Sequence, residues 1–329
     1  MSAAPLRPPG AAVAADEVDL AAAIGPLRLP HPVLTAAGAV GWGPELDRFA
    51  PLAELGAFVT PTLHLRERSG RAAPRLAPAP SGLLSATGLP GPGAAAFAES
   101  AAPALAERGA RLIVSIAGAT TDELVALARQ FYAHPGVAAL EVHLGAPAAD
   151  GRPGPAVDPV AASRAISGLR RAAHPSTPIV AKLSPEAVDI VALARACVDA
   201  GADALALIGP LPALALDLDA LRPALEGGLS GPAIRPIALR CVWRVHQALP
   251  AVPLIGMGGI ASGRDALAFL LAGASAVAVG TAALHDPSAP VRIRAELAAE
   301  LGARGFGSAA QAVGFAHRGT GAPEEQEGP

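Results

Sequence analysis

Residues 252–282 read VPLIGMGGIASGRDALAFLLAGASAVAVGTA, and this stretch passes from one strand through a helix into a second strand. Its two short apolar runs, Val252–Met257 and Ala276–Thr281, are each closed by glycine, which is typical of buried strands. Between the two runs, Ser262 stands where a helix cap is expected and Gly273 stands where the helix should end. The stretch therefore predicts parallel strands joined by a crossover helix, as in α/β folds.

The same alternation of short apolar runs and longer amphipathic runs continues through the chain. Eight strands are predicted: Val33–Ala37, Ala57–Leu63, Arg111–Ala117, Val137–Leu144, Ile179–Leu183, Ala204–Ile208, Val252–Met257 and Ala276–Thr281. Eight strand–helix units predict a single-domain (β/α)8 TIM barrel over residues 17–316. Residues 1–16 and residues 317–329, where Gly, Pro and Glu accumulate towards the end, are predicted to be disordered tails.

A doubly wound open sheet is the competing architecture. It needs a glycine-rich fingerprint after the first strand and an acidic residue about twenty positions later. The segment Ala36–Gly43 is rich in glycine, but no acidic residue follows at a strand end with that spacing. The barrel is therefore the favoured fold.

Composition limits the function classes. Among 329 residues, 52% are hydrophobic and 16% are charged. The formal net charge is -3, and only three residues are Trp or Tyr. A nucleic-acid binder is therefore not expected, and a small-molecule ligand is favoured. Cys197 and Cys241 lie in predicted helices without Cys/His ligand spacing, so we expect neither a disulfide nor a metal site. The chain shows no secretion signal and no apolar stretch of membrane-spanning length, which predicts a cytoplasmic protein with no membrane contact.

Glycines follow the last two predicted strands, where a parallel barrel commonly binds phosphate. Gly256–Gly259 ends the seventh strand and Gly280 ends the eighth, so backbone N–H groups from both corners can converge on a phosphate. The alternative is that these glycines serve only tight turns. Gly227–Gly231, read as a loop after the sixth strand, would let the backbone approach a cofactor closely, or would be a flexible loop that binds nothing.

Lys182 is the single lysine of the otherwise apolar fifth strand. A buried ammonium group needs a partner, and one that points into the barrel mouth can stabilise negative charge on a reduced flavin. The alternative is a lysine whose head group reaches solvent at the strand end.

Three long runs carry a family resemblance: Gly227–Arg240, Gly256–Ile260 and Leu271–Ala282. They resemble the class 1B dihydroorotate dehydrogenases, and shorter matches extend the similarity over nearly the whole chain between the tails. The resemblance implies an FMN-bearing flavoprotein that oxidises dihydroorotate to orotate in pyrimidine biosynthesis. By position, the residues that it implies around FMN are Ala37, Gly38, Thr62, Lys182, Gly231, Gly258, Gly259, Gly280 and Thr281.

The departures from the family pattern gather on the substrate side. The catalytic base of the family is a cysteine, or a serine in another class, and Ala146 stands at that position. The asparagines that hold the substrate correspond here to Ser85, His143, Ala148 and Gly209. The lysine at the end of the second strand corresponds to Pro61. An altered substrate is therefore expected.

Two groups of residues are candidate replacements. His143 takes an inward position over the expected flavin, and an imidazole titrates near neutral pH, so His143 can act as acid or base or can simply fill space. His64, Arg66 and Arg68 can bring positive charge to the rim or be solvated loop residues. The catalytic candidates are then His143 and Lys182, and the substrate candidates are Ser85, His143 and Gly209.

The sequence thus predicts an FMN-dependent oxidoreductase acting on CH–CH groups, similar to dihydroorotate dehydrogenase, with an altered substrate. One alternative is a catalytically silent flavin-binding or structural barrel. Another is a true dihydroorotate dehydrogenase that uses His143 as its base. The resemblance also implies an iron–sulfur flavoprotein electron-transfer subunit as partner and a homodimer.

Overall fold

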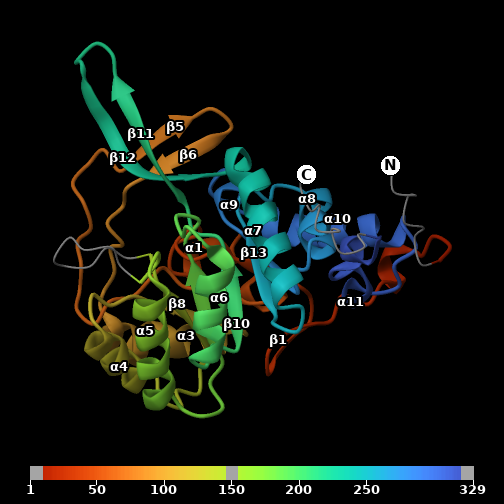
Figure 1. Ribbon diagram of the computed structural model, residues 1–329, viewed down its shortest axis with the longest axis horizontal. Coiled ribbons are helices and arrows are strands. Elements are labelled where there is room, and N and C mark those ends of the chain that lie inside the picture. The colour runs from red at the N-terminus through yellow and green to blue at the C-terminus, as the bar shows by residue number, and fades with distance from the viewer. Residues whose placement is uncertain (1–9, 146–154, 320–329) are drawn as a thin grey trace, which may run out of the picture.

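The computed structural model describes residues 10–145 and 155–319, and it contains the predicted barrel (Figure 1). Eight parallel strands pair in the order β3-β14-β13-β10-β9-β8-β7-β4. Their bounds are β3 (Val33–Thr35), β4 (Phe58–Val59), β7 (Leu112–Ile116), β8 (Val137–His143), β9 (Ile179–Leu183), β10 (Ala204–Leu207), β13 (Leu254–Met257) and β14 (Ala276–Val279). The N–H of Gly56 donates to the carbonyl of Val33 at 2.9 Å, so β3 and β4 meet and nearly close the barrel. Each strand lies within a predicted run, and the predicted fold is confirmed.

Helices connect the strands on the outside of the barrel. The longer ones are α4 (Thr121–Gln130), α5 (Pro159–Ala172), α6 (Ile190–Asp199), α7 (Arg235–Ala248), α8 (Gly263–Leu271) and α10 (Ala289–Gly302). The shorter ones are α1 (Pro44–Asp47), α2 (Ala94–Ala96), α3 (Ala102–Glu107), α9 (Thr281–His285) and α11 (Ala309–Ala312), with the 3-10 helices η1 (Ala15–Glu17), η2 (Leu52–Glu54), η4 (Pro232–Ile234) and η5 (Phe315–Gly319) and the π-helix η3 (Phe97–Ala101). The predicted cap of α8 is confirmed, because the Ser262 hydroxyl accepts from the N–H of Asp265 at 3.2 Å.

Two apolar layers hold the barrel together, since alternate residues of a strand point to opposite faces. One layer packs the strands against the helices. The other fills the barrel interior with Leu34, Ala57, Val59, Ile113, Ala139, Val180, Ala204, Ala206, Ile255, Met257, Ala276 and Ala278. Val180 faces this interior, so the period of two places Lys182, two residues on, at the same face and nearer the carboxyl end of β9. At the opposite end, the hairpin of β1 (Ala22–Ile24) and β2 (Leu27–Leu29) packs Ile24 and Leu29 against the same interior cluster.

A second sheet, which the sequence analysis did not predict, is built from the loops at the carboxyl ends of β4 and β10. Its antiparallel strands β5 (Leu76–Ala79), β6 (Gly82–Ser85), β11 (Leu211–Asp217) and β12 (Arg222–Ser230) pair in the order β11-β12-β6-β5. The reading of Gly227–Gly231 as a loop was therefore wrong, because four of these five residues lie in β12. A Cβ at Gly227 would lie 2.3 Å from the carbonyl oxygen of Ser85, so glycine permits close contact between strands here.

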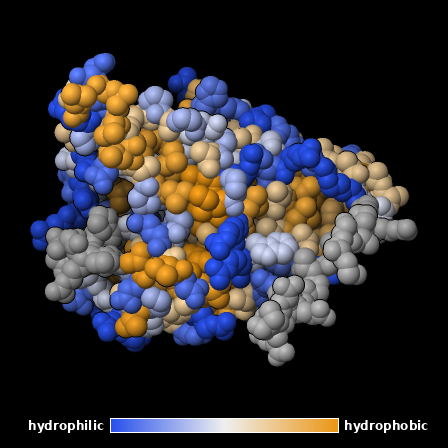
Figure 2. All heavy atoms as spheres, turned by 45° about the horizontal axis from the view of Figure 1, so that its top comes forward, coloured by the Kyte–Doolittle hydropathy of each residue, from blue (hydrophilic) through white to orange (hydrophobic). Residues whose placement is uncertain are grey.

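The hairpin of β11 and β12 extends away from the barrel at the upper left of Figure 1. Four large apolar side chains are exposed along it: Leu214, Leu216, Leu218 and Leu221. The same corner of the molecule is hydrophobic in Figure 2.

The remaining predictions concern the cysteines and the chain ends. Cys197 in α6 and Cys241 in α7 are both free and buried, and burial raises the pKa of the Cys197 thiol to about 12. None of the helices in the described ranges is both long and apolar enough to cross a bilayer. Residues 1–9 and 320–329 of the predicted tails lie outside the described residues. Within the described part of the N-terminal tail, the N–H of Val13 donates to the carbonyl of Gly302 at 2.9 Å. The boundaries of the two tails stay a prediction.

Candidate functional site

Three of the predicted glycine-corner residues line one cavity of about 310 Å³ beyond the carboxyl ends of β13 and β14. They are Gly231 after β12, Gly259 after β13, and Thr281 after β14, and we call this space the glycine cavity. Gly258 and Gly280 adjoin these residues in the chain but are not among those that line the cavity. The two predicted corners thus meet, together with the end of β12.

Glycine is required at the cavity by backbone conformation and by space. Gly259 has φ +79°, in the left-handed region, and a Cβ there would lie 2.8 Å from both the carbonyl oxygen of Gly231 and the Cβ of Arg235. The hydroxyl of Thr281 donates to the hydroxyl of Ser230 at 2.8 Å and so joins two of the loops. Helix α9 begins at Thr281 without a side-chain cap, and the first N–H groups of a helix have no acceptor within it. The cavity therefore offers backbone donors.

A buried polar chain lies at the carboxyl ends of β4, β7, β8 and β9. The Lys182 ammonium is 3.6 Å from a carboxylate oxygen of Glu141, and the two residues are 6% and 1% exposed. The Ser115 hydroxyl donates to the same Glu141 oxygen at 3.1 Å, and the hydroxyls of Thr62 and Ser115 are 3.0 Å apart. Lys182 is thus buried instead of reaching solvent, and Glu141 partly compensates its charge.

Of the four residues in this buried polar chain, the sequence analysis named Lys182 and Thr62 as site residues but gave no role to Glu141 or Ser115. A signal was present for Glu141, because the predicted fourth strand contains one acidic residue and the predicted fifth strand contains one lysine. The strand register, which pairs His143 with Lys182 and Glu141 with Val180, is what brings the two charges together. That register was not predictable from either strand alone.

His143 ends β8 beside Lys182, as expected for an inward position. Burial above all, and then the charges of Lys182 and His64, lower the pKa of His143 to about 3. Burial and then the charge of Arg68 lower the pKa of His64 to about 4. Both imidazoles are therefore neutral at pH 7, and His143 does not titrate near neutral pH as the sequence analysis had assumed. The Nδ1 atom of His64 is buried and has no hydrogen-bond partner within residues 10–145 and 155–319.

The other predicted residues are distributed around these two centres. Gly209 lies next to the end of β9, where its N–H donates to the carbonyl of Leu183 at 3.0 Å. Gly38 has φ +74°, and the position of its missing Cβ is open space. Ala37 packs against the barrel interior, and Ser85 lies in β6 with its hydroxyl 3.5 Å from the carbonyl oxygen of Gly228.

Two further sets of predicted residues complete the account. Arg66 and Arg68 are exposed in the loop after β4. Ala146 and Ala148 lie outside the described residues, so the position of the family's base is known here only from the sequence.

Comparison with known proteins now identifies the family. Residues 19–301 match the family model of dihydroorotate dehydrogenase. The chain belongs to the dihydroorotate dehydrogenase family. It is 45% identical over 306 residues to the dihydroorotate dehydrogenase B (NAD(+)) catalytic subunit of Desulforudis audaxviator, covering 92% of this chain and 99% of that protein. The subunits of the same name from Geotalea daltonii and Pelobacter propionicus are 43% and 45% identical, covering 90% and 84% of this chain and 97% and 91% of theirs.

Membership of the dihydroorotate dehydrogenase family confirms the resemblance drawn from the sequence. It also confirms the predicted class of protein, an FMN-dependent oxidoreductase acting on CH–CH groups. The residues that would contact FMN and substrate are a separate question, which the family match leaves to the geometry of this chain.

Proposed function

We propose that this member of the dihydroorotate dehydrogenase family binds FMN in the glycine cavity and acts on a substrate other than dihydroorotate. The observation that carries the proposal is a contrast within one site. The glycine corners and the Lys182–Glu141 pair are all present, whereas the substrate side has Ala146 in place of a base and a histidine with a pKa of about 3.

The residues at the cavity fit a flavin phosphate. Backbone N–H groups near Gly231, Gly259 and Thr281 would hold the phosphate, because these positions expose main chain to the cavity and a helix begins at Thr281. Lys182 would place positive charge beside the flavin ring, with Glu141 holding the ammonium in place. FMN supplies reversible hydride transfer when bound, and the protein supplies binding and orientation.

The substrate side fits dihydroorotate poorly. Dihydroorotate is an anion with a polar ring, and each polar group buried in a site needs a hydrogen-bond partner. At the aligned positions Gly209 and Pro61 have no polar side chain, and Ser85 is shorter than the family's asparagine. This supports a substrate that is smaller or less polar than dihydroorotate.

His143 is suited to binding a substrate more than to removing a proton. A neutral imidazole offers one donor and one acceptor. A general base works best when its pKa lies near the working pH, and a pKa of about 3 makes His143 a weak base at neutral pH. The pKa therefore disfavours the alternative in which His143 replaces the cysteine base in dihydroorotate oxidation. The absence of a base at Ala146 is the observation that favours the other alternative, a catalytically silent flavin-binding barrel.

Purified protein separates these functions. A yellow protein whose visible spectrum is that of bound flavin supports the cofactor assignment, and a colourless protein that takes up no FMN would reject it. Without oxygen, the oxidised flavin is then offered dihydroorotate and a panel of small CH–CH compounds, and the photoreduced flavin is offered orotate and a panel of small C=C compounds. Reoxidation by a panel member but not by orotate supports a changed substrate, turnover of dihydroorotate supports the true dehydrogenase, and no reaction with any compound supports the silent barrel.

The names of the relatives suggest a partner. They are called catalytic subunits of an NAD(+) enzyme, so we propose that this chain also works with a separate electron-transfer subunit. Light scattering of the purified chain would test the predicted homodimer. Co-expression with the electron-transfer subunit of a relative's enzyme, followed by affinity purification of the tagged chain, would test the partner. Recovery of the chain alone would contradict it.

A further inference from the structure

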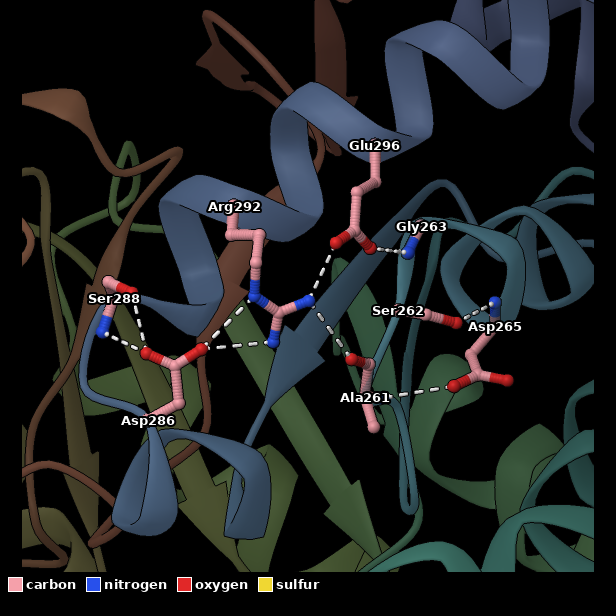
Figure 3. A network of polar contacts seen from close by, with 8 residues as sticks. All are labelled: Ala261, Ser262, Gly263, Asp265, Asp286, Ser288, Arg292 and Glu296. Atoms are coloured by element: carbon pink, nitrogen blue, oxygen red, sulfur yellow. Dashed lines mark hydrogen bonds and ion pairs between the residues drawn. The ribbon is translucent and has the colours of Figure 1, made fainter.

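Arg292, in the first turn of α10, lines the glycine cavity. Its side chain points towards Asp286 and Ala261 (Figure 3). Its guanidinium donates to the Asp286 carboxylate at 3.0 and 3.1 Å and to the Glu296 carboxylate at 2.7 Å. A weaker contact of 3.4 Å joins it to the carbonyl oxygen of Ala261. One side chain thus links two separate loops to its own helix.

These two loops carry the residues that line the cavity after β13 and β14. Ala261 follows Gly259 in the loop after β13, and Asp286 follows α9, which starts at Thr281 after β14. The guanidinium of Arg292 therefore links the two corners to which a phosphate would bind.

The loop after β13 is held from its other side as well. The second carboxylate oxygen of Glu296 accepts from the N–H of Gly263 at 2.7 Å, at the start of α8. Asp265 accepts from the N–H of Ala261 at 3.1 Å and pairs with Arg235 at 2.6 Å. Within this network, Arg292 is thus the residue that connects the loop after β13 to Asp286 in the loop after β14, as Figure 3 shows.

Charge gives Arg292 a second role. Asp286 and Arg292 are the two side chains of permanent charge that line the cavity in the described parts of the chain. The hydroxyl of Ser288 and then Arg292 hold the pKa of Asp286 below its usual value, so Asp286 is an anion at neutral pH. Glu296 supplies a second anion, and the single guanidinium leaves the trio with a net charge of minus one. Without Arg292 the net charge of the two carboxylates would be minus two, and Asp286 would face a phosphate dianion with no adjacent guanidinium.

We infer that Arg292 determines the specificity of this cavity for phosphorylated flavin, by linking the two glycine corners and by offsetting part of the negative charge of Asp286 at the cavity wall. The inference rests on the proposed function, because it assigns the cavity to the phosphate of FMN. It makes Arg292 a positioning and specificity residue with no part in hydride transfer.

The test compares FMN with riboflavin, which differs from FMN by the phosphate. Dissociation constants for both are measured by quenching of flavin fluorescence on apoprotein, for the wild type, Arg292→Gln, Asp286→Asn and the double variant. We expect Arg292→Gln to weaken FMN binding about tenfold and riboflavin binding less than twofold, and we expect Asp286→Asn to restore the part of the loss that comes from the uncompensated Asp286 carboxylate. The loss should shrink as ionic strength rises.

Arg294→Gln is the matched control. Arg294 lies on the same helix with similar exposure, but it pairs with Glu54 at 3.4 Å and does not line the cavity. Its removal should leave both dissociation constants unchanged.

Three results would overturn the inference: unchanged FMN binding in Arg292→Gln, equal weakening of FMN and riboflavin, or no recovery on adding Asp286→Asn. In each of these the wild type still binds FMN, so the proposed function survives. A wild type that binds neither flavin rejects the proposed function. Because the inference rests on that function, it falls in that case too.

Discussion

Replacing Gly259 by alanine should separate cofactor binding from folding. At Gly259 the backbone has φ +79°, where an L-residue with a Cβ is strained by about 1–2 kcal/mol. The added Cβ would also lie 2.8 Å from the Gly231 carbonyl oxygen, well inside ordinary contact distance. Relief requires the two cavity loops to move apart, which would displace backbone donors from the phosphate. We expect the affinity for FMN to fall at least tenfold, or about 1.4 kcal/mol.

Gly109→Ala is the control for backbone strain. Gly109 has φ +77°, and a Cβ there would lie 3.0 Å from the Cβ of Ala53, at a turn that does not line the cavity. Both variants should lose comparable stability in urea denaturation of the apoprotein, and only Gly259→Ala should lose FMN in a fluorescence titration. Wild-type affinity for FMN in Gly259→Ala would refute the reasoning, as would equal losses of affinity in the two variants.

Three further predictions concern the ionisable side chains His143, His64, Lys182 and Glu141. In a histidine NMR titration, the resonance missing from His143→Gln should not shift between pH 5 and pH 9, because the pKa of His143 is about 3; a midpoint near 6.5 would contradict this. Lys182→Met should lower the free energy of unfolding of the apoprotein in urea by about 3–5 kcal/mol, because it leaves Glu141 buried without its cationic partner. The double variant with Glu141→Leu should regain most of that loss. Equal stability of the single and double variants would argue against the pair. The pKa values of His143 and His64 lie below the 6.5 of an exposed histidine, so the unfolded chain binds more protons on acidification. The free energy of unfolding should hold above about pH 6.5 and fall towards pH 4, less steeply in His64→Asn. A flat urea midpoint over this range would be inconsistent with partly buried, neutral imidazoles.

The strand–helix periodicity was enough to predict the barrel, because each strand is a short apolar run closed by glycine or a polar residue. It also located the glycine corners, since in a parallel barrel all strands end at one face. The second sheet was missed for a physical reason. Glycines in β12 look like a flexible loop in sequence, and their function as sites of close strand contact depends on β6 and β11, which lie far away in the chain.

The chemistry of the site was less accessible than its location. A sequence shows that His143 is a histidine, but its pKa depends on burial and on the charge of Lys182 in the adjacent strand. The buried polar chain likewise depends on register, which sets Glu141 and Lys182 within reach of each other. The pKa of His143 and the contact between Lys182 and Glu141 both depend on residues that become neighbours only when the chain folds.

The position of the glycine cavity in the chain has a consequence for how this barrel can change. Apart from Gly82, the cavity is lined by residues that come after residue 230, whereas the altered substrate-side positions all come before residue 210. Under the proposed function, phosphate binding and substrate choice are thus encoded in different parts of the gene. Recombination near the β11–β12 hairpin could exchange one while inheriting the other intact.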